Sequence, residues 1–190
     1  MADYPPLRVH VLDVGHGDSI IVEFPDRQTF GIVDCHRCAE TQPGYMGIGD
    51  EHEPKALSFF RRFRKQRTRP VVQFACLTHP HADHYRGFAQ VLSGLLDLNI
   101  EVKEFWDFMA SRRKAEVLKA LASTHEQHAD ASDLEELYHV VERLRDHRGC
   151  KERFLIQPQT DWHVHPSGVR IDCLAPDTQT ASEYMNYQML

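Results

Sequence analysis

The sequence predicts a single α/β domain, and three observations support this. Short apolar runs rich in Val, Ile, Leu and Phe, which are typical of strands, recur along the chain. Segments whose apolar residues follow helical spacing lie between several of these runs. The chain has 190 residues and 42% hydrophobic content, which is enough for one domain with a substantial core. We therefore expect one domain over residues 1–190.

The N-terminal third is expected to begin with strands. Gly15 and Gly17 permit a tight turn, so the first two strands should form a hairpin, and a polar turn separates the second strand from the third. The three strands are expected at residues 7–14, 19–24 and 29–34.

A glycine-containing loop over residues 40–54 should lead into a helix over residues 54–66, which Pro54 opens. The apolar stripe of this helix consists of Ala56, Phe59, Phe60 and Phe63. Its other face and the residues that follow are basic: Arg61, Arg62, Arg64, Lys65, Arg67 and Arg69. This face has two interpretations, a solvated surface or a surface that binds phosphate groups.

The rest of the chain continues the alternation of strands and helices. Ser132 and Glu135 have the spacing of a capping box at the start of a helix that runs to Gly149. Together with a helix over residues 111–124, this gives a helical segment at about residues 111–148, which either packs on the core or forms an exposed insert. Strands are expected at residues 71–77, 100–108 and 153–157, a helix at 85–96, and a hairpin at 162–165 and 169–175.

A His-Pro-His-Ala-Asp-His sequence directly follows the apolar run at residues 71–77, and its potential metal ligands are His79, His81, Asp83 and His84. Alternate residues of an extended backbone point the same way, so we expect the first three to face one side, and the proline favours that backbone. The fourth should point elsewhere and serve a second ion, roughly 3.5–4 Å from the first. Imidazole and carboxylate suit Zn²⁺, with Mn²⁺ or Fe as alternatives.

The chain contains 13 histidines, so an isolated pair of histidines would mean little. Four potential ligands within six positions after a buried strand favour a metal site over a polar loop that is merely rich in histidine. This motif resembles the signature of the metallo-β-lactamase superfamily. The stretch Leu12-Asp13-Val14-Gly15-His16-Gly17-Asp18-Ser19 is similar to the opening of its competence-type branch, which includes the hydrolase-like domain attached to bacterial DNA-uptake channels.

The resemblance implies a four-layer αββα sandwich with two metal ions at one edge of the paired sheets. It implies that Asp34 braces the metal loop without binding metal, and that His16 lies near the rim, as a substrate contact or as a turn residue in solvent. Two residues depart from the family pattern, which usually has glycine in their places. They are His36, which could border the site, and Arg86, which could contact a phosphate or carboxylate or point outwards.

A complete site of this kind would be a hydrolytic centre. His79 and His81 would hold one Zn²⁺ and Asp83 and His84 the other, and a metal-bound hydroxide would attack the substrate, so Asp83 and His84 are the expected catalytic residues. The competence-type motif and the basic helix favour a phosphodiester or nucleic-acid substrate. A thioester or lactone hydrolase, or a non-catalytic module that binds metal or protein, remains an alternative.

The family pattern also requires a further histidine, a bridging aspartate in a Gly-Asp pair and a last histidine after the metal loop. The only Gly-Asp pairs, Gly17-Asp18 and Gly49-Asp50, precede it. We therefore expect the C-terminal half of the sandwich to be incomplete, with a protein partner, a second subunit or unusual ligands completing the site if the chain is not a fragment. The unusual ligands considered are His36, His163 and His165.

Composition constrains the expected binding partners and cellular location of the chain. A net charge of −6 argues against wholesale wrapping around nucleic acid. The five cysteines indicate reduced thiols in a cytosolic protein, although Cys35 and Cys38 form a lone pair that could bind zinc or act in redox chemistry. No N-terminal signal pattern and no apolar run of ~20 residues is seen, so we expect a cytoplasmic protein without a membrane segment.

Overall fold

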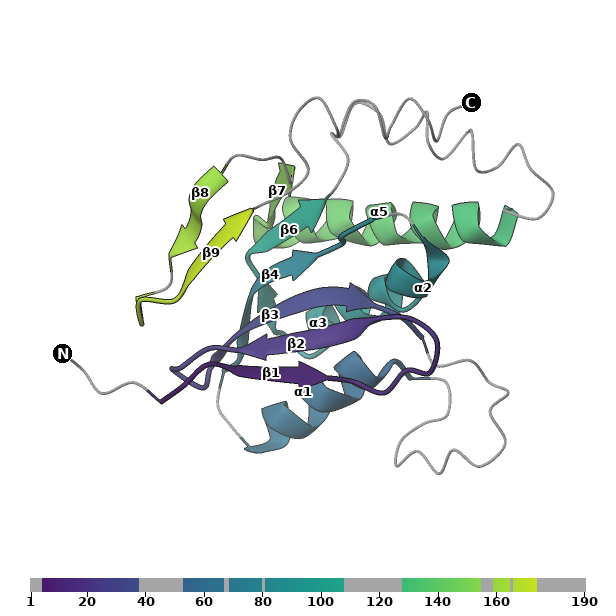
Figure 1. Cartoon of the computed structure of the whole chain (residues 1–190). Helices are drawn as coiled ribbons and strands as arrows, with labels where there is room; N and C mark the ends of the chain where they lie inside the picture. The colour runs from purple at the N-terminus through teal and green to yellow at the C-terminus, as the bar shows by residue number, and fades with distance from the viewer. Residues whose placement is uncertain are drawn as a thin grey trace.

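The computed structural model describes residues 5–37, 53–66, 69–79, 81–107, 128–154, 159–164 and 166–173. Within this part the chain has a mixed α/β structure with a seven-stranded sheet and a separate two-stranded sheet (Figure 1). Several predictions fall outside the described residues: most of the loop at 40–54, the helix at 111–124, Cys38, Pro80, the end of the strand at 153–157, His165 and residues 174–190.

The strands are β1 (Arg8–Val11), β2 (Ser19–Glu23), β3 (Thr29–Cys35), β4 (Val71–Cys76), β5 (Glu101–Val102), β6 (Glu104–Asp107), β7 (Lys151–Phe154), β8 (Gln159–Val164) and β9 (Arg170–Cys173). The helices are α1 (Lys55–Gln66), α2 (Ala82–Tyr85), α3 (Phe88–Asp97) and α5 (His128–Arg148). In the main sheet the order is β1-β2-β3-β4-β6-β7, and β5 also pairs with β4. The β1–β2–β3 meander is antiparallel, whereas β3, β4, β6 and β7 are mutually parallel.

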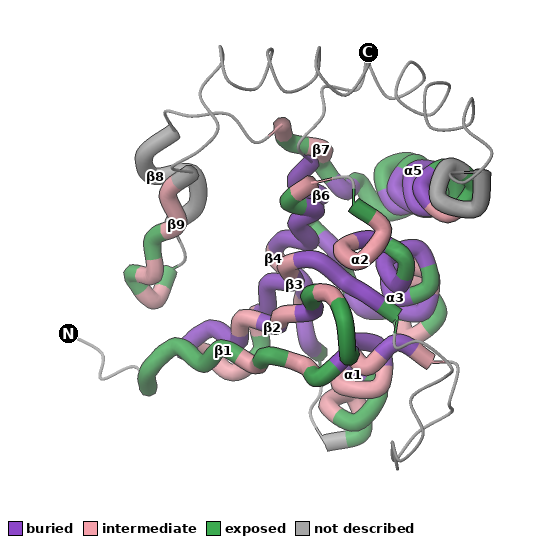
Figure 2. Tube along the Cα trace, turned by 45° about the vertical axis from the view of Figure 1, so that its right-hand side comes forward, coloured by how far each residue is buried: buried purple, intermediate pink, exposed green. Residues whose placement is uncertain are grey.

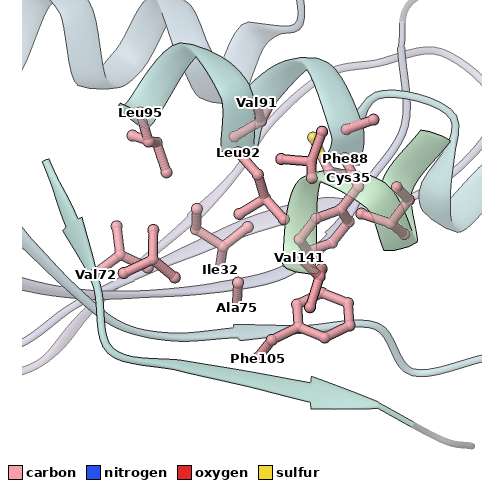
Figure 3. Close-up of a cluster of buried hydrophobic side chains, with 14 of the residues drawn as sticks. Ile32, Cys35, Val72, Ala75, Phe88, Val91, Leu92, Leu95, Phe105 and Val141 are labelled. Atoms are coloured by element: carbon pink, nitrogen blue, oxygen red, sulfur yellow. The ribbon is translucent and has the colours of Figure 1, made fainter. Parts of the chain in front are cut away.

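The helices of the described residues, α1, α2, α3 and α5, lie against one face of the main sheet, as Figure 2 shows. The parallel strands advance in one direction across the sheet, and right-handed crossovers in one direction place their helices on the same side. The apolar stripe predicted for α1 packs as expected, because Phe30 of β3 lies 4.6 Å from Phe63 and 5.4 Å from Phe60, ring centroid to ring centroid, at steep angles. Figure 3 shows the centre of this core, where α3 meets the sheet through Phe88, Val91, Leu92, Leu95, Ile32, Val72, Ala75 and Phe105.

The opposite face of the sheet has a second, smaller core. It contains Phe24, Phe74, Cys76 and Trp106, and the β8–β9 hairpin packs on it through Val169 and Ile171. The rings of Phe74 and Trp106 are stacked with centroids 4.0 Å apart. On β1, Val9 and Val11 remain 58% and 75% exposed, so the described residues cover this face only in part. The chain therefore has helices on one side of the sheet and a strand pair on the other.

Most predicted elements are confirmed, with shifted bounds. The strand expected at 100–108 is interrupted at Lys103, whose amide donates a hydrogen bond to the carbonyl of Val72. The prediction of a capping box is wrong, because α5 begins at His128 and both Ser132 and Glu135 lie inside the helix. Its end is as predicted: Gly149 has φ 69°, and its amide bonds to the Arg145 carbonyl.

Of the two roles considered for the helical segment, the structure supports packing for α5. Leu134, Leu137, Val141 and Leu144 of this helix are buried in the main core, so it is no exposed insert. Among the described residues, no helix is both long and apolar enough to cross a membrane.

Candidate metal centre

Three segments far apart in sequence meet at one edge of the main sheet. Because β3 and β4 are parallel, the chain leaves both strands at this edge, after Cys35 and Cys76. Ser19, the first residue of β2, pairs with Cys35, so the glycine turn that precedes it lies at the same edge. The predicted metal motif therefore sits beside the Gly-His-Gly-Asp turn. This proximity follows from strand pairing and is absent from the linear sequence.

The histidines of the motif form a compact cluster. The ring centroid of His79 lies 4.6 Å from that of His81 and 3.8 Å from that of His84. The expectation that His84 points away from the other ligands is therefore wrong. Its Nε2 also lies 3.7 Å from a carboxylate oxygen of Asp83, so all four predicted ligands converge.

The backbone reason for this convergence is a short helix. His81 is extended, with φ −88° and ψ 141°, but α2 begins at the next residue. Asp83 is therefore helical, and our expectation that it continues an extended run is wrong. Successive residues on a helix are rotated by about 100°, so Asp83 and His84 are no longer on opposite sides of the chain.

Asp34 supports the motif from below, as the resemblance implies. One of its carboxylate oxygens accepts the amide of Thr78 at 2.9 Å. The other oxygen accepts the Thr78 hydroxyl at 2.7 Å and is 2.9 Å from Nδ1 of His84. Asp34 is 3% exposed and has φ 52°, a left-handed conformation that aspartate adopts more readily than most residues.

These contacts fix the role of Nδ1 in two of the three motif histidines, His79 and His84. A carboxylate only accepts hydrogen bonds, so Nδ1 of His84 must be the donor towards Asp34. The Thr78 hydroxyl gives its single hydrogen to Asp34, so in its 2.9 Å contact with Nδ1 of His79 it must accept. In the neutral form, both imidazoles therefore carry hydrogen on Nδ1 and leave the lone pair of Nε2 available, as is usual for metal-binding histidines whose other ring nitrogen donates to an acceptor.

Asp18 is a candidate ligand that the sequence interpretation missed. It lies in the glycine turn, and its carboxylate oxygen is 3.7 Å from Nδ1 of His84. Asp18, Asp34 and His84 bring potential ligand atoms within 4.8 Å of one another. Because both Asp34 oxygens already accept hydrogen bonds, we assign Asp34 as a brace. Asp18 is the other carboxylate of this group, and the atom of His84 that it approaches is Nδ1, which carries hydrogen, and not Nε2. Its only sequence signal is a carboxylate next to a glycine turn.

Burial and neighbouring charges favour the protonation states of His79 and Asp83 that bind metal. Burial lowers the pKa of His79, and the neighbouring imidazoles of His84 and His81 lower it further, so the ring is neutral at pH 7. Burial alone would raise the pKa of Asp83, but its own backbone amide and the histidines His84, His16 and His81 outweigh this and hold it below its usual value. Asp83 is therefore ionised.

The remaining sequence candidates occupy the rim. His16 is 91% exposed, and its Nδ1 lies 3.8 Å from a carboxylate oxygen of Asp83, so it is a solvent-exposed turn residue that also borders the site. The guanidinium of Arg86 lies 3.8 Å from Asp133 of α5, which ties α2 to that helix. His36 is buried beneath the glycine turn and donates its amide to the Asp18 carbonyl.

Cys35 is buried, and burial raises the pKa of its thiol to about 12. A protonated, inaccessible thiol is a poor nucleophile and a poor metal ligand. This geometry argues against the redox or zinc interpretation of the cysteine pair. The donor set at the sheet edge is thus imidazole and carboxylate.

The comparisons with known proteins identify no relative. No family model matches the chain, and neither the curated proteins nor the solved structures contain a significant match.

Proposed function

We propose that the chain is a metal-dependent hydrolase with a site of metallo-β-lactamase type at the edge of its main sheet. One observation carries the proposal: the convergence of four motif ligands with Asp18 above a carboxylate brace. Imidazole nitrogen and carboxylate oxygen are the donors of catalytic zinc sites. The donors present thus fit Zn²⁺, with Mn²⁺ or Fe as alternatives.

In this proposal each residue has a defined task. His79 and His84 would bind through Nε2, His81 through its imidazole, and Asp83 and Asp18 through their carboxylates. Asp34 and Thr78 would hold the two braced imidazoles in one orientation and one tautomer, which keeps their lone pairs aimed at the site. A cation bound there would supply Lewis acidity, which lowers the pKa of water from 15.7 towards ~7 and so makes a nucleophile available at neutral pH.

The substrate class that we favour is a phosphodiester, including nucleic acid. The support is the similarity of the glycine turn to competence-type proteins together with the basic residues of α1. Arg61 of that helix is paired with Glu53, so the basic face is partly neutralised. A panel of small thioesters and lactones set against single-stranded DNA and RNA separates this substrate class from the ester alternative.

The decisive test removes two ligands at once. In the double variant His81→Ala with Asp83→Ala, metal-dependent cleavage should be abolished, because two of the five donors are lost. The matched control is His139→Ala with Glu142→Ala, an exposed pair on α5 whose nitrogen and oxygen lie 3.6 Å apart, and it should retain full activity. Cleavage that survives in the first variant would sink the proposal.

A non-catalytic module that binds metal or protein is the second candidate. It is favoured by the sequence, in which both Gly-Asp pairs precede the metal loop and none follows it. Such a module would bind metal, or form a stable complex with a protein partner or a second subunit, without turnover on any substrate of the panel.

A further inference from the structure

We infer that His36 is a positioning residue: its side chain locks the glycine turn to the first turn of α2 and so sets the spacing between Asp18 and Asp83. The inference rests on the proposed function insofar as the positioned carboxylates serve a metal centre.

Backbone hydrogen bonds join three segments in series, from His36 through Asp18 to Asp83. The amide of His36 donates to the Asp18 carbonyl at 2.9 Å. The amide of Asp18 in turn donates to the Asp83 carbonyl at 3.2 Å. Strand β3, the glycine turn and α2 are therefore linked directly, and a shift of His36 would be felt by both carboxylates.

Two glycines enclose His36, one from each segment that it joins. A Cβ atom built on Gly17 would lie 2.7 Å from Cγ of His36 and would overlap the Asp83 carbonyl oxygen. On the other side, a Cβ atom built on Gly87 would lie 3.1 Å from the backbone carbonyl carbon of His36. Gly87 also donates its amide to the Cys35 carbonyl at 2.8 Å. The close approach of Gly17 restricts the His36 ring, and that of Gly87 restricts the backbone of His36.

The chemistry of the side chain argues for more than filling space. His36 is only 9% exposed, and its Nδ1 has no hydrogen-bond partner among the described residues. An apolar side chain would fill the same volume without burying a polar atom. The ring forms a hydrogen bond with the backbone of Ala82 in α2, and the charged groups that act on it are Asp83, His16 and Arg86.

The test compares His36→Ala and His36→Gln with wild type by amide hydrogen exchange in metal-free protein, followed by titration with Co²⁺ read by visible absorption. In His36→Ala the Asp18 amide should exchange at least about tenfold faster while the Ala75 amide of β4 keeps its rate. Affinity for Co²⁺ should fall roughly 10–100-fold, as is usual when a supporting residue of a metal site is lost. Glutamine retains a polar side chain of similar size, so His36→Gln should show a smaller acceleration of exchange and a smaller loss of Co²⁺ affinity than His36→Ala.

The matched control is His10→Ala, a partly buried histidine on β1 whose Nε2 lies 2.9 Å from Glu23, and it should change neither readout. An unchanged Asp18 amide in His36→Ala, or equal acceleration at Asp18 and Ala75, would overturn the inference whatever the titration gives. If wild-type protein binds no Co²⁺, the proposed function fails, and the exchange data still decide the role of His36. The two failures are therefore distinguishable.

Discussion

Asp34 and Thr78 set the orientation and the tautomer of two candidate ligands, His79 and His84. The carboxylate accepts from Thr78 and His84, and the hydroxyl of Thr78 accepts from His79 because its own hydrogen is already given to Asp34. Two imidazoles are thereby fixed in the same tautomer by one buried carboxylate. The motif itself could be identified from its residue types, but this arrangement could not, because Asp34 lies 44 residues before Thr78.

Replacing Thr78 with Val removes the hydroxyl but keeps the shape of the side chain. We expect metal affinity to fall roughly 10–100-fold, because His79 loses the acceptor that fixes its tautomer. The free energy of unfolding should fall by only about 1 kcal/mol, as for a typical hydrogen bond. Isothermal titration with Zn²⁺ and urea unfolding measure the two quantities.

Thr29→Val is the control, because the Thr29 hydroxyl donates to Asp26 at 2.6 Å in a turn of the β2–β3 hairpin. It loses an equivalent Thr–Asp hydrogen bond away from the site and should leave metal affinity unchanged. Equal affinity losses in the two variants would contradict the role of Thr78.

At the scale of the elements, the site depends on close contact between the glycine turn and α2. Gly17 has φ 119°, and its α-carbon faces the carbonyl oxygen of Asp83 and the side chain of His36. A side chain there meets a backbone atom, which cannot move without shifting α2. The position of α2, which carries Asp83 and His84, therefore depends on the absence of a side chain at residue 17.

Gly17→Ala should destabilise the protein and displace α2. Gly168→Ala is the matched control, because Gly168 also has a positive φ, 84°, but its Cβ would meet no atom within 4 Å. The control should cost about 1–2 kcal/mol, the strain of a left-handed residue. Gly17→Ala should cost at least roughly 2 kcal/mol more, since the overlap adds to that strain. Thermal unfolding measures both, and similar costs would refute the close contact.

At the scale of the whole molecule, the site lies where parts of the chain that are distant in sequence meet, and backbone hydrogen bonds already link them. A cation held by Asp18, Asp83 and the histidines would tie the β1–β2 turn to the end of β4 and to α2. Binding to the folded state alone adds stability by mass action.

Metal content and thermal stability should therefore change together. Protein purified without added metal or chelator should contain about two ions per chain by elemental mass spectrometry if the site is complete in solution. At a free Zn²⁺ concentration 100 times Kd the gain is about 2.7 kcal/mol, which raises the Tm of a chain of this size by roughly 5–11 °C. A chelator should reverse the shift, and His81→Ala with Asp83→Ala should not show it.

A metal content near zero together with a Tm that does not respond to Zn²⁺ would count against a metal centre formed by this chain alone. It would direct attention to a protein partner or a second subunit that supplies further ligands.

Local sequence determined much of the architecture. Apolar runs with polar turns specify β2, β3 and β4, and the phenylalanine spacing of α1 specifies its buried face, because these patterns act over a few neighbouring residues. The candidate ligands His79, His81, Asp83 and His84 were proposed from residue type and spacing alone.

Only the tertiary structure decided how these parts meet. The parallel pairing of β3 with β4 brings Asp34 beneath Thr78, and the antiparallel pairing of β2 with β3 brings Asp18 to His84. The turn of helix at α2 rotates Asp83 and His84 towards the other ligands. Such contacts join residues separated by tens of positions, and no local sequence pattern specifies the distance between them. The contacts of Asp34, the proximity of Asp18 and the proposed role of His36 were therefore visible only in the fold.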